Sequence, residues 1–217
     1  MHAWTRQPAE AIAIQQRLRH EPVVAPLSTP VRWLAAVDTG YADAGRIARA
    51  AAVLFELPAL TPVEQQLAEL PVEFPYVPGL LSFRELPAVV AALLRLSRRP
   101  DLILCDGQGI AHPRRLGIAS HLGLLVDIAT IGVGKSRLIG HHAEVGSCKG
   151  DWVPLLDKGE RIGSVLRTRT GVKPLYISPG HRVDHEQAID WTLATTTRYR
   201  LPEPIRLADR LASNRSA

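Results

Sequence analysis

The chain has 217 residues, of which 46% are hydrophobic and 22% are charged, a balance that excludes a wholly disordered chain and predicts one globular domain. Its two cysteines are too few for a disulfide framework, which favours a reducing, cytoplasmic compartment. The net charge of +5 is compatible with a polyanionic partner but does not establish one. The most apolar stretch, 117–134, is interrupted by His121 and Asp127, so we expect no transmembrane helix and no membrane partner.

The first third of the chain predicts a helix followed by strands. Residues 5–20 have the pattern of an amphipathic helix. The apolar stretches 31–41 and 47–57 predict two strands, and Gly45 between them suits a hairpin turn. Residues 61–72 have mixed periodicity and fit either a third strand or a short helix.

The rest of the chain alternates helices and strands. In order, the patterns predict a helix at 84–97, a strand at 101–105, a helix at 114–128, a short strand "TIGVG", a strand pair "RIGSVLRT" and "KPLYIS", and a helix at 184–199. This order predicts a mixed α/β sheet covered by helices, in a single domain over 1–217 with an N-terminal helical segment at 1–25. We expect residues 201–217 to form a surface tail, because they are rich in Pro, Arg and Ser. Nothing in the sequence indicates a large apolar interface, so we expect a monomer.

Two predicted strands end in an aspartate, Asp38 and Asp106. Functional groups collect at the carboxyl ends of strands in open α/β sheets, so we expect these carboxylates to converge, with Glu85 as a third acid from the start of a helix. Carboxylates this close repel one another unless a cation holds them. Their oxygens suit Mg²⁺ or Mn²⁺, which activate water and stabilise the leaving oxygen of a phosphodiester. Alternatively, the Asp-Gly after a strand is a turn, and Glu85 only complements the helix dipole.

The segment "DGQGIAHPRRLGIASH" follows the second aspartate. Its glycines let the backbone approach a ligand closely, and His112, Arg114 and Arg115 beside an acid fit phosphate chemistry. A histidine before a proline is nevertheless more often structural than functional. Asp184 and Glu186 open the last predicted helix. Asp184 fits an N-terminal cap of that helix, and Glu186 is a less favoured candidate for the site.

The stretch "IGVGKS" resembles a phosphate-binding loop only superficially. That motif requires a glycine five positions before the Gly-Lys-Ser core, and Ala129 stands there. Lys135, at the end of a predicted strand, could instead meet a substrate phosphate as a point charge. A surface lysine is the alternative.

Several blocks together resemble the bacterial members of the endonuclease V family, the deoxyinosine 3′-endonucleases of DNA repair: "VAPLSTPVRWLAAVDTGY", "FPYVPGLLSFRELP", "CDGQGIAHPRRLGIASHLGLLVDIATIGVGKSRLIG", "PLYISPGHRV" and "YRLPEPIRLAD". The blocks occur in the family's order over about residues 5–213. The resemblance implies a ribonuclease H-like fold. It also implies hydrolysis of DNA at the second phosphodiester bond 3′ to a deaminated purine, chiefly hypoxanthine, with Mg²⁺ or substituting Mn²⁺ as the cofactor. The products would carry 3′-hydroxyl and 5′-phosphate ends.

The resemblance further implies roles for individual residues. Asp38 and Asp106 match the metal-binding aspartates, and Glu85 matches the third acid. His112 and Lys135 match basic residues near the scissile phosphate. His181 matches a further histidine of the site.

A second set of residues matches the machinery that recognises the damaged base. Tyr76 matches the wedge tyrosine, within a loop that has Val77 where isoleucine is usual. The residues that match the pocket for the extruded base are Gly79, Leu81, Gly107 and Ile118. The segment before the catalytic lysine more often has alanine where this chain has Gly134, which leaves rate and metal preference open but not the reaction class.

Two other function classes remain open from the sequence. Another ribonuclease H-like nuclease, acting on inosine-containing RNA or on DNA structures, would keep the same acids; only the wedge and the pocket distinguish it. A non-catalytic nucleic-acid-binding module is the third class. The three intact acids oppose that class, because without a metal they would repel a polyanion.

Overall fold

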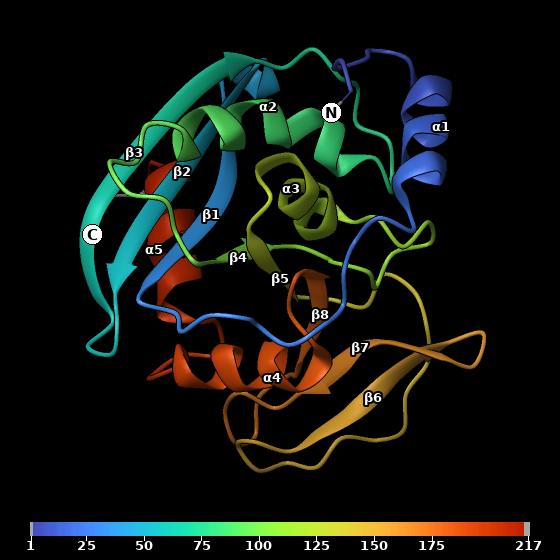
Figure 1. Cartoon of the computed structure of the whole chain (residues 1–217), viewed down its shortest axis with the longest axis vertical. Coiled ribbons are helices and arrows are strands. Elements are labelled where there is room, and N and C mark those ends of the chain that lie inside the picture. Colours follow the sequence, from blue (N-terminus) through green and yellow to red (C-terminus); the bar gives the residue numbers. More distant parts are fainter. Residues whose placement is uncertain (1, 215–217) are drawn as a thin grey trace.

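Over residues 2–214, the part of the chain that the computed structural model describes, eight strands form one mixed sheet in the order β3-β2-β1-β4-β5-β8-β7-β6 (Figure 1). The strands are β1 (Trp33–Ala42), β2 (Ile47–Glu56), β3 (Thr61–Pro71), β4 (Leu102–Asp106), β5 (Ala129–Gly134), β6 (Trp152–Asp157), β7 (Glu160–Leu166) and β8 (Leu175–His181). The helices are α1 (Pro8–Leu18), α2 (Leu81–Leu93), α3 (Ile118–Val126), α4 (His185–Ala194) and α5 (Glu203–Ala212).

The central strands β1, β4 and β5 run parallel, and the strands on either side of them pair antiparallel. In the β1–β4 register Val37 lies beside Cys105, so the next residues, Asp38 and Asp106, occupy one row of the sheet. In the β4–β5 register Asp106 lies beside Val133. The parallel pairing therefore brings Asp38 level with the ends of β4 and β5, whereas β1 itself continues to Ala42 beside β2.

The two faces of the sheet are buried under different helices, because side chains alternate between faces along a strand. Leu34 and Ala36 of β1 pack with α4 and α5, whereas Ala35 and Val37 pack with α2 and α3. Figure 1 shows α5 alongside β1 and β2, and α4 near β7 and β8. By the same alternation, the side chain of Asp38 projects toward the α5 face.

Most predicted elements are present, and residues 61–71 resolve to the strand β3. Two elements were not predicted. The first is the edge strand β6, in which Pro154 obscures the strand pattern.

Among the described residues, no helix has both the length and the apolar character that crossing a bilayer requires.

The second unpredicted element replaces most of the expected surface tail. Glu203–Ala212 forms helix α5, which buries Ile205, Ala208 and Ala212 against the sheet. Pro204 falls in the first turn of α5, where proline is tolerated because the first N–H groups of a helix have no partner within it. The prolines that suggested a tail therefore mark the start of a helix; residues 215–217 lie outside the described part.

Candidate active site

Asp38 lies in the middle of β1, where the pairing of β1 with β4 ends, and in the same row of the sheet as Asp106, the last residue of β4. Oδ1 of Asp38 accepts a hydrogen bond of 2.8 Å from the N–H of Thr39. Burial, and then the negative charge of Asp106, raise the pKa of Asp38 to about 8. Burial also raises the pKa of Asp106. The site thus holds two carboxylates whose negative charges are unfavourable unless a cation compensates them.

Lys135 supplies one such positive charge from the segment that follows β5. Its Nζ forms an ion pair with Oδ2 of Asp106. Burial disfavours the ammonium ion, but the charges of Asp106 and Asp38 outweigh it and raise the pKa of Lys135. Lys135 therefore remains a cation in the middle of the acids.

A further acid, Asp209, joins this group from α5, and the sequence reasoning missed it. Its charge acts on Asp38, Asp106 and Lys135, raising the pKa of each. The signal that could have revealed it is the helical spacing of the apolar residues in α5. This spacing predicts a helix that packs on the sheet and places Asp209 next to the buried Ala208.

Glu85 approaches the aspartates from α2, on the other face of the sheet. Its Oε1 accepts a hydrogen bond of 2.9 Å from the hydroxyl of Tyr41, which in turn accepts one of 3.1 Å from Nε of Arg84. Burial is the main reason that the pKa of Glu85 rises to about 7, and the charge of Asp106 adds to it. Glu85 thus belongs to the same electrostatic group as the two aspartates.

These carboxylates have the oxygen chemistry that Mg²⁺ and Mn²⁺ prefer. As the side chains stand, no three histidine, cysteine, aspartate or glutamate side chains within residues 2–214 are close enough together to hold a metal ion. The acids nevertheless act on one another electrostatically, and a divalent cation would relieve the repulsion that raises their pKa values. The donor set therefore fits a hard divalent metal.

A hollow of about 330 Å³ lies next to the acids and gathers all five residues assigned to base recognition. These are Tyr76, Gly79, Leu81, Gly107 and Ile118. The ring of Tyr76 is 73% exposed at the rim. Gly107 directly follows Asp106 and has φ of +139°, and a Cβ at this position would lie 2.6 Å from Cγ2 of Ile118. A side chain there would collide with Ile118 and would adopt an unfavourable backbone conformation, so the position requires glycine.

His112 lies in the wall of this hollow and contacts its loop. Its Nδ1 accepts the N–H of Arg114 at 3.2 Å, which leaves Nε2 to donate to the carbonyl oxygen of Gly79 at 3.0 Å. Burial, and then the charge of Arg114, lower the pKa of His112 to about 4. In the structure His112 is therefore a neutral hydrogen-bond donor to the loop rather than a cation next to the acids.

The structure does not bring His181 to the acids. In the β5–β8 pairing His181 lies opposite Thr130, near the start of β5 and away from Val133, the neighbour of Asp106. Its ring nitrogens contact the backbone N–H of Val23 at 3.2 Å and Oδ1 of Asp127 at 3.4 Å. These contacts hold the segment before β1 against the sheet.

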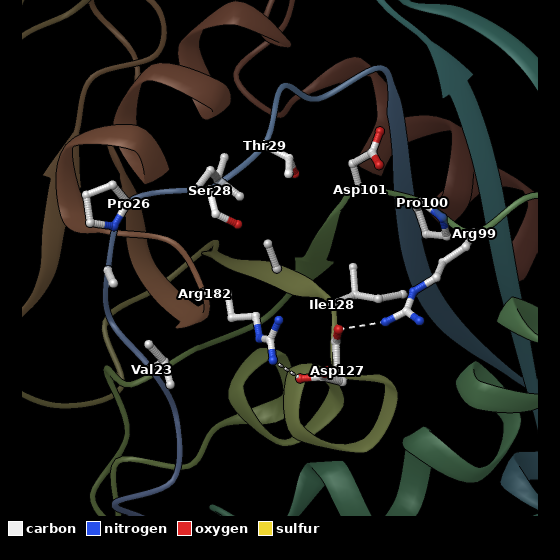
Figure 2. A pocket seen from close by; sticks show the side chains of 13 residues that line it. Val23, Pro26, Ser28, Thr29, Arg99, Pro100, Asp101, Asp127, Ile128 and Arg182 are labelled. Carbon is white, nitrogen blue, oxygen red and sulfur yellow. Dashed lines mark hydrogen bonds and ion pairs between the residues drawn. The ribbon is translucent and has the colours of Figure 1, made fainter.

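A second hollow, of about 510 Å³, lies near His181 and is shown in Figure 2. Its two arginines both serve the carboxyl end of α3: Arg99 donates to the carbonyl oxygens of Val126 and Asp127, and Arg182 pairs with the Asp127 carboxylate at 2.7 Å. The remaining charged residue of the hollow, Asp101, accepts the backbone N–H groups of Arg32 at 2.9 Å and Trp33 at 2.8 Å. Because the charged groups of this hollow all have partners within the fold, we do not assign the active site to it.

The acids that open α4 are also remote from the cluster. Asp184 caps α4 by accepting the N–H of Gln187 at 2.8 Å. Glu186 pairs with Arg161 at 2.6 Å on the surface. Both side chains therefore have a structural role.

Comparison with known proteins agrees with this arrangement. The chain matches the family model described as Endonuclease V over residues 13–210. It is 56% identical to an endonuclease V of Trichormus variabilis, with 99% of this chain and 97% of the relative covered. The crystal structure of an endonuclease V from Streptomyces avermitilis superposes with a TM-score of 0.92 at 43% identity, covering 98% of this chain and 94% of that one.

A more distant relative is known in complex with DNA. A Ciona intestinalis endonuclease V, 27% identical with a TM-score of 0.84 and 95% of each chain covered, was crystallised with a 23-mer DNA that contains an inosine followed by a ribo-adenosine. The fold is thus the ribonuclease H-like α/β fold of these enzymes. The chain belongs to the endonuclease V family of nucleases.

Proposed function

We propose that the chain is a DNA-repair endonuclease that hydrolyses the second phosphodiester bond 3′ to deoxyinosine or another deaminated purine, leaving 3′-hydroxyl and 5′-phosphate ends. The observation that carries the proposal is the junction between Asp106 and Gly107. One residue belongs to the acid cluster, and the next lines a hollow whose rim carries the exposed ring of Tyr76. A single backbone segment therefore joins a site for phosphodiester chemistry to a site for an extruded base.

We propose Mg²⁺, with Mn²⁺ as a substitute, as the cofactor, held by Asp38, Asp106, Glu85 and the added ligand Asp209. When bound, such an ion activates water and neutralises charge on the phosphate. Lys135 keeps its proton because of the surrounding acids and can offer its ammonium group to the scissile phosphate.

Base recognition uses the hollow beside the acids. Inosine pairs less well than the original base, so its extrusion costs less free energy. Tyr76 would stack in the vacated place, which is worth about 1–3 kcal/mol per base. Hypoxanthine presents a carbonyl where adenine has an amine, and backbone N–H groups of the glycine-rich turns that line the hollow would favour that carbonyl. The N–H of Gly107 itself is not among them, because it donates to the carbonyl oxygen of Val133 at 3.2 Å.

A metal-titrated cleavage assay tests the proposal. The substrates are duplexes with a single deoxyinosine, the matched duplex with deoxyadenosine, and an RNA with inosine at the same place. We expect metal-dependent cleavage of the deoxyinosine strand at one position, and none by Asp38→Asn or Asp106→Asn, although both variants still bind the duplex. Cleavage confined to the RNA would favour the alternative ribonuclease H-like activity, and normal cleavage by either variant would refute the metal assignment.

We further propose that the enzyme acts as a monomer in the cytoplasm. Its two cysteines, Cys105 and Cys148, are both free, which suits a reducing compartment. Light scattering at the concentration of the cleavage assay measures the molecular mass, and the mass of a dimer would refute the proposed monomer.

A further inference from the structure

The carbonyl oxygen of Gly79, in the loop that carries Tyr76, receives three N–H donors. They are Nε2 of His112 at 3.0 Å, Nη2 of Arg114 at 2.9 Å and Nε2 of Gln15 at 3.1 Å. A carbonyl oxygen has two lone pairs, so three donors are more than it needs. This concentration of donors fixes one point of the loop at the wall of the base hollow.

Gln15 also binds a second lining segment of the hollow. It is the one donor of the three that comes from α1, and only 1% of its surface is exposed. Its Nε2 also donates to the carbonyl oxygen of Leu116 at 3.1 Å, and Leu116 lines the same hollow. One buried amide therefore joins the Gly79 wall to the Leu116 wall.

The orientation of this amide follows from its partners. Nε of Arg114 is always a donor and contacts Oε1 of Gln15, so Oε1 must be the acceptor. Nε2 then faces the two carbonyl oxygens with its two hydrogens. Every polar group of Gln15 is thus used, and no other orientation of the amide satisfies all three contacts.

The rest of α1 packs against the protein through apolar side chains, including the half-buried Ile12 and Ile14. Ala11 is its other buried residue, and it packs with Phe74, Leu80 and Phe83 around the Tyr76 loop. Gly79 has φ of +79°, and a Cβ there would lie 2.9 Å from Nη2 of Arg114, so the loop backbone lies directly against these donors. Without the Gln15 bonds, His112 and Arg114 would still hold the Gly79 carbonyl, but the direct bridge between Gly79 and the Leu116 carbonyl would be lost and the loop would be held more weakly.

We propose that Gln15 is a positioning residue that sets the width of the base hollow and thereby the preference for hypoxanthine over a larger deaminated purine. The role in substrate choice rests on the proposed function. The role in holding the two walls together does not.

The decisive variant is Gln15→Glu in the full chain. It keeps the size of the side chain and the acceptor for Arg114 but removes both donated hydrogen bonds. The matched control is Gln187→Glu, because Oε1 of Gln187 accepts the N–H of Leu27 at 2.6 Å and a carboxylate accepts it equally well. Arg114→Lys, which loses the planar fork that reaches both Gly79 and Gln15, serves as a second variant should Gln15→Glu fail to fold.

The first measurement is amide hydrogen exchange of the protein without DNA. We expect residues 77–81 and 116–119 to exchange about tenfold faster in Gln15→Glu than in the parent chain, because a buried unpaired group destabilises its surroundings. Gln187→Glu should match the parent chain in both segments. Unchanged exchange in both segments would overturn the positioning role.

The second measurement is the ratio of kcat/KM for a deoxyinosine duplex to that for a deoxyxanthosine duplex. We expect this ratio to fall about tenfold in Gln15→Glu, with the Mg²⁺ concentration for half-maximal rate unchanged. A merely structural glutamine would lower both rates equally, and that result would overturn the inference. Should the parent chain cleave neither duplex, the proposed function fails, and hydrogen exchange alone decides whether Gln15 holds the walls.

Discussion

Replacing Asp38 by asparagine should abolish cleavage but stabilise the metal-free protein. In the folded chain burial and the charge of Asp106 raise the pKa of Asp38 to about 8, from 3.8 in the unfolded chain. The unfolded chain therefore releases this proton near pH 4, whereas the folded chain keeps it until near pH 8. Between these values the folded state binds more protons, so stability falls as pH rises. Asparagine avoids this loss, and its Oδ1 can still accept the N–H of Thr39.

The size of the expected gain in the free energy of unfolding follows from the shift in the pKa of Asp38. About four pKa units at 1.36 kcal/mol per unit set an upper limit of about 6 kcal/mol at pH 8 and above. Rearrangement of Lys135 and entry of water lower this limit, so we expect the variant to gain about 2 kcal/mol. For a chain of 217 residues that gain raises Tm by about 4–8 °C.

Thermal and urea unfolding with a chelator, near pH 8 and near pH 5, measure the gain. It should be present near pH 8 and smaller near pH 5, where the folded carboxyl is already protonated. Excess Mg²⁺ should stabilise the parent chain and close the gap, because a ligand that binds only the folded state raises its stability. A variant that is less stable at both pH values, or a gain independent of pH, would refute the electrostatic reasoning.

Three further changes probe other parts of the site. Tyr76→Ala should weaken binding of a deoxyinosine duplex about tenfold or more without lowering Tm, because the ring is 73% exposed; fluorescence anisotropy and melting curves check this, and Tyr76→Phe should bind normally. Lys135→Met should lower kcat about 100-fold or more, whereas Lys135→Arg should retain more of the rate. If Lys135→Met and the parent chain had equal rates in single-turnover assays, Lys135 would have no part in the mechanism. Pro78→Gly should blur the cleavage position, which mapping of product ends at single-nucleotide resolution would show, and a single unshifted product would mean that Pro78 does not set the distance.

The convergence of Asp38 and Asp106 could be predicted because it depends on short-range patterns. Each aspartate directly follows an apolar run, and parallel neighbouring strands end at the same edge of a sheet. Asp209 was missed, because Pro202 and Pro204 suggested a chain leaving the domain. Counting the apolar spacing after those prolines would have identified the helix.

The roles of Gln15 and His112 could not be derived from periodicity at all. The bond from Gln15 to Gly79 joins residues 64 positions apart, and the bond from Gln15 to Leu116 joins residues 101 positions apart. No local pattern in the sequence marks such a contact, since a buried glutamine on a helix resembles any polar residue of that helix. The resemblance to a family placed His112 near a phosphate, whereas in the structure Nε2 of His112 faces the Gly79 carbonyl oxygen at 3.0 Å.

The acid cluster and the base hollow are connected by short backbone segments on both sides. On one side Asp106 and Gly107 are consecutive residues at the end of a buried central strand. On the other side the loop of Tyr76 runs into α2, which carries Glu85, and its Gly79 is held by donors from α1 and from the segment before α3. An extruded base and the phosphate beside the acids would therefore be bound at a separation that the protein backbone sets. Cleavage at one fixed position beyond the lesion is the expected consequence, because a looser connection on either side would yield products of several lengths.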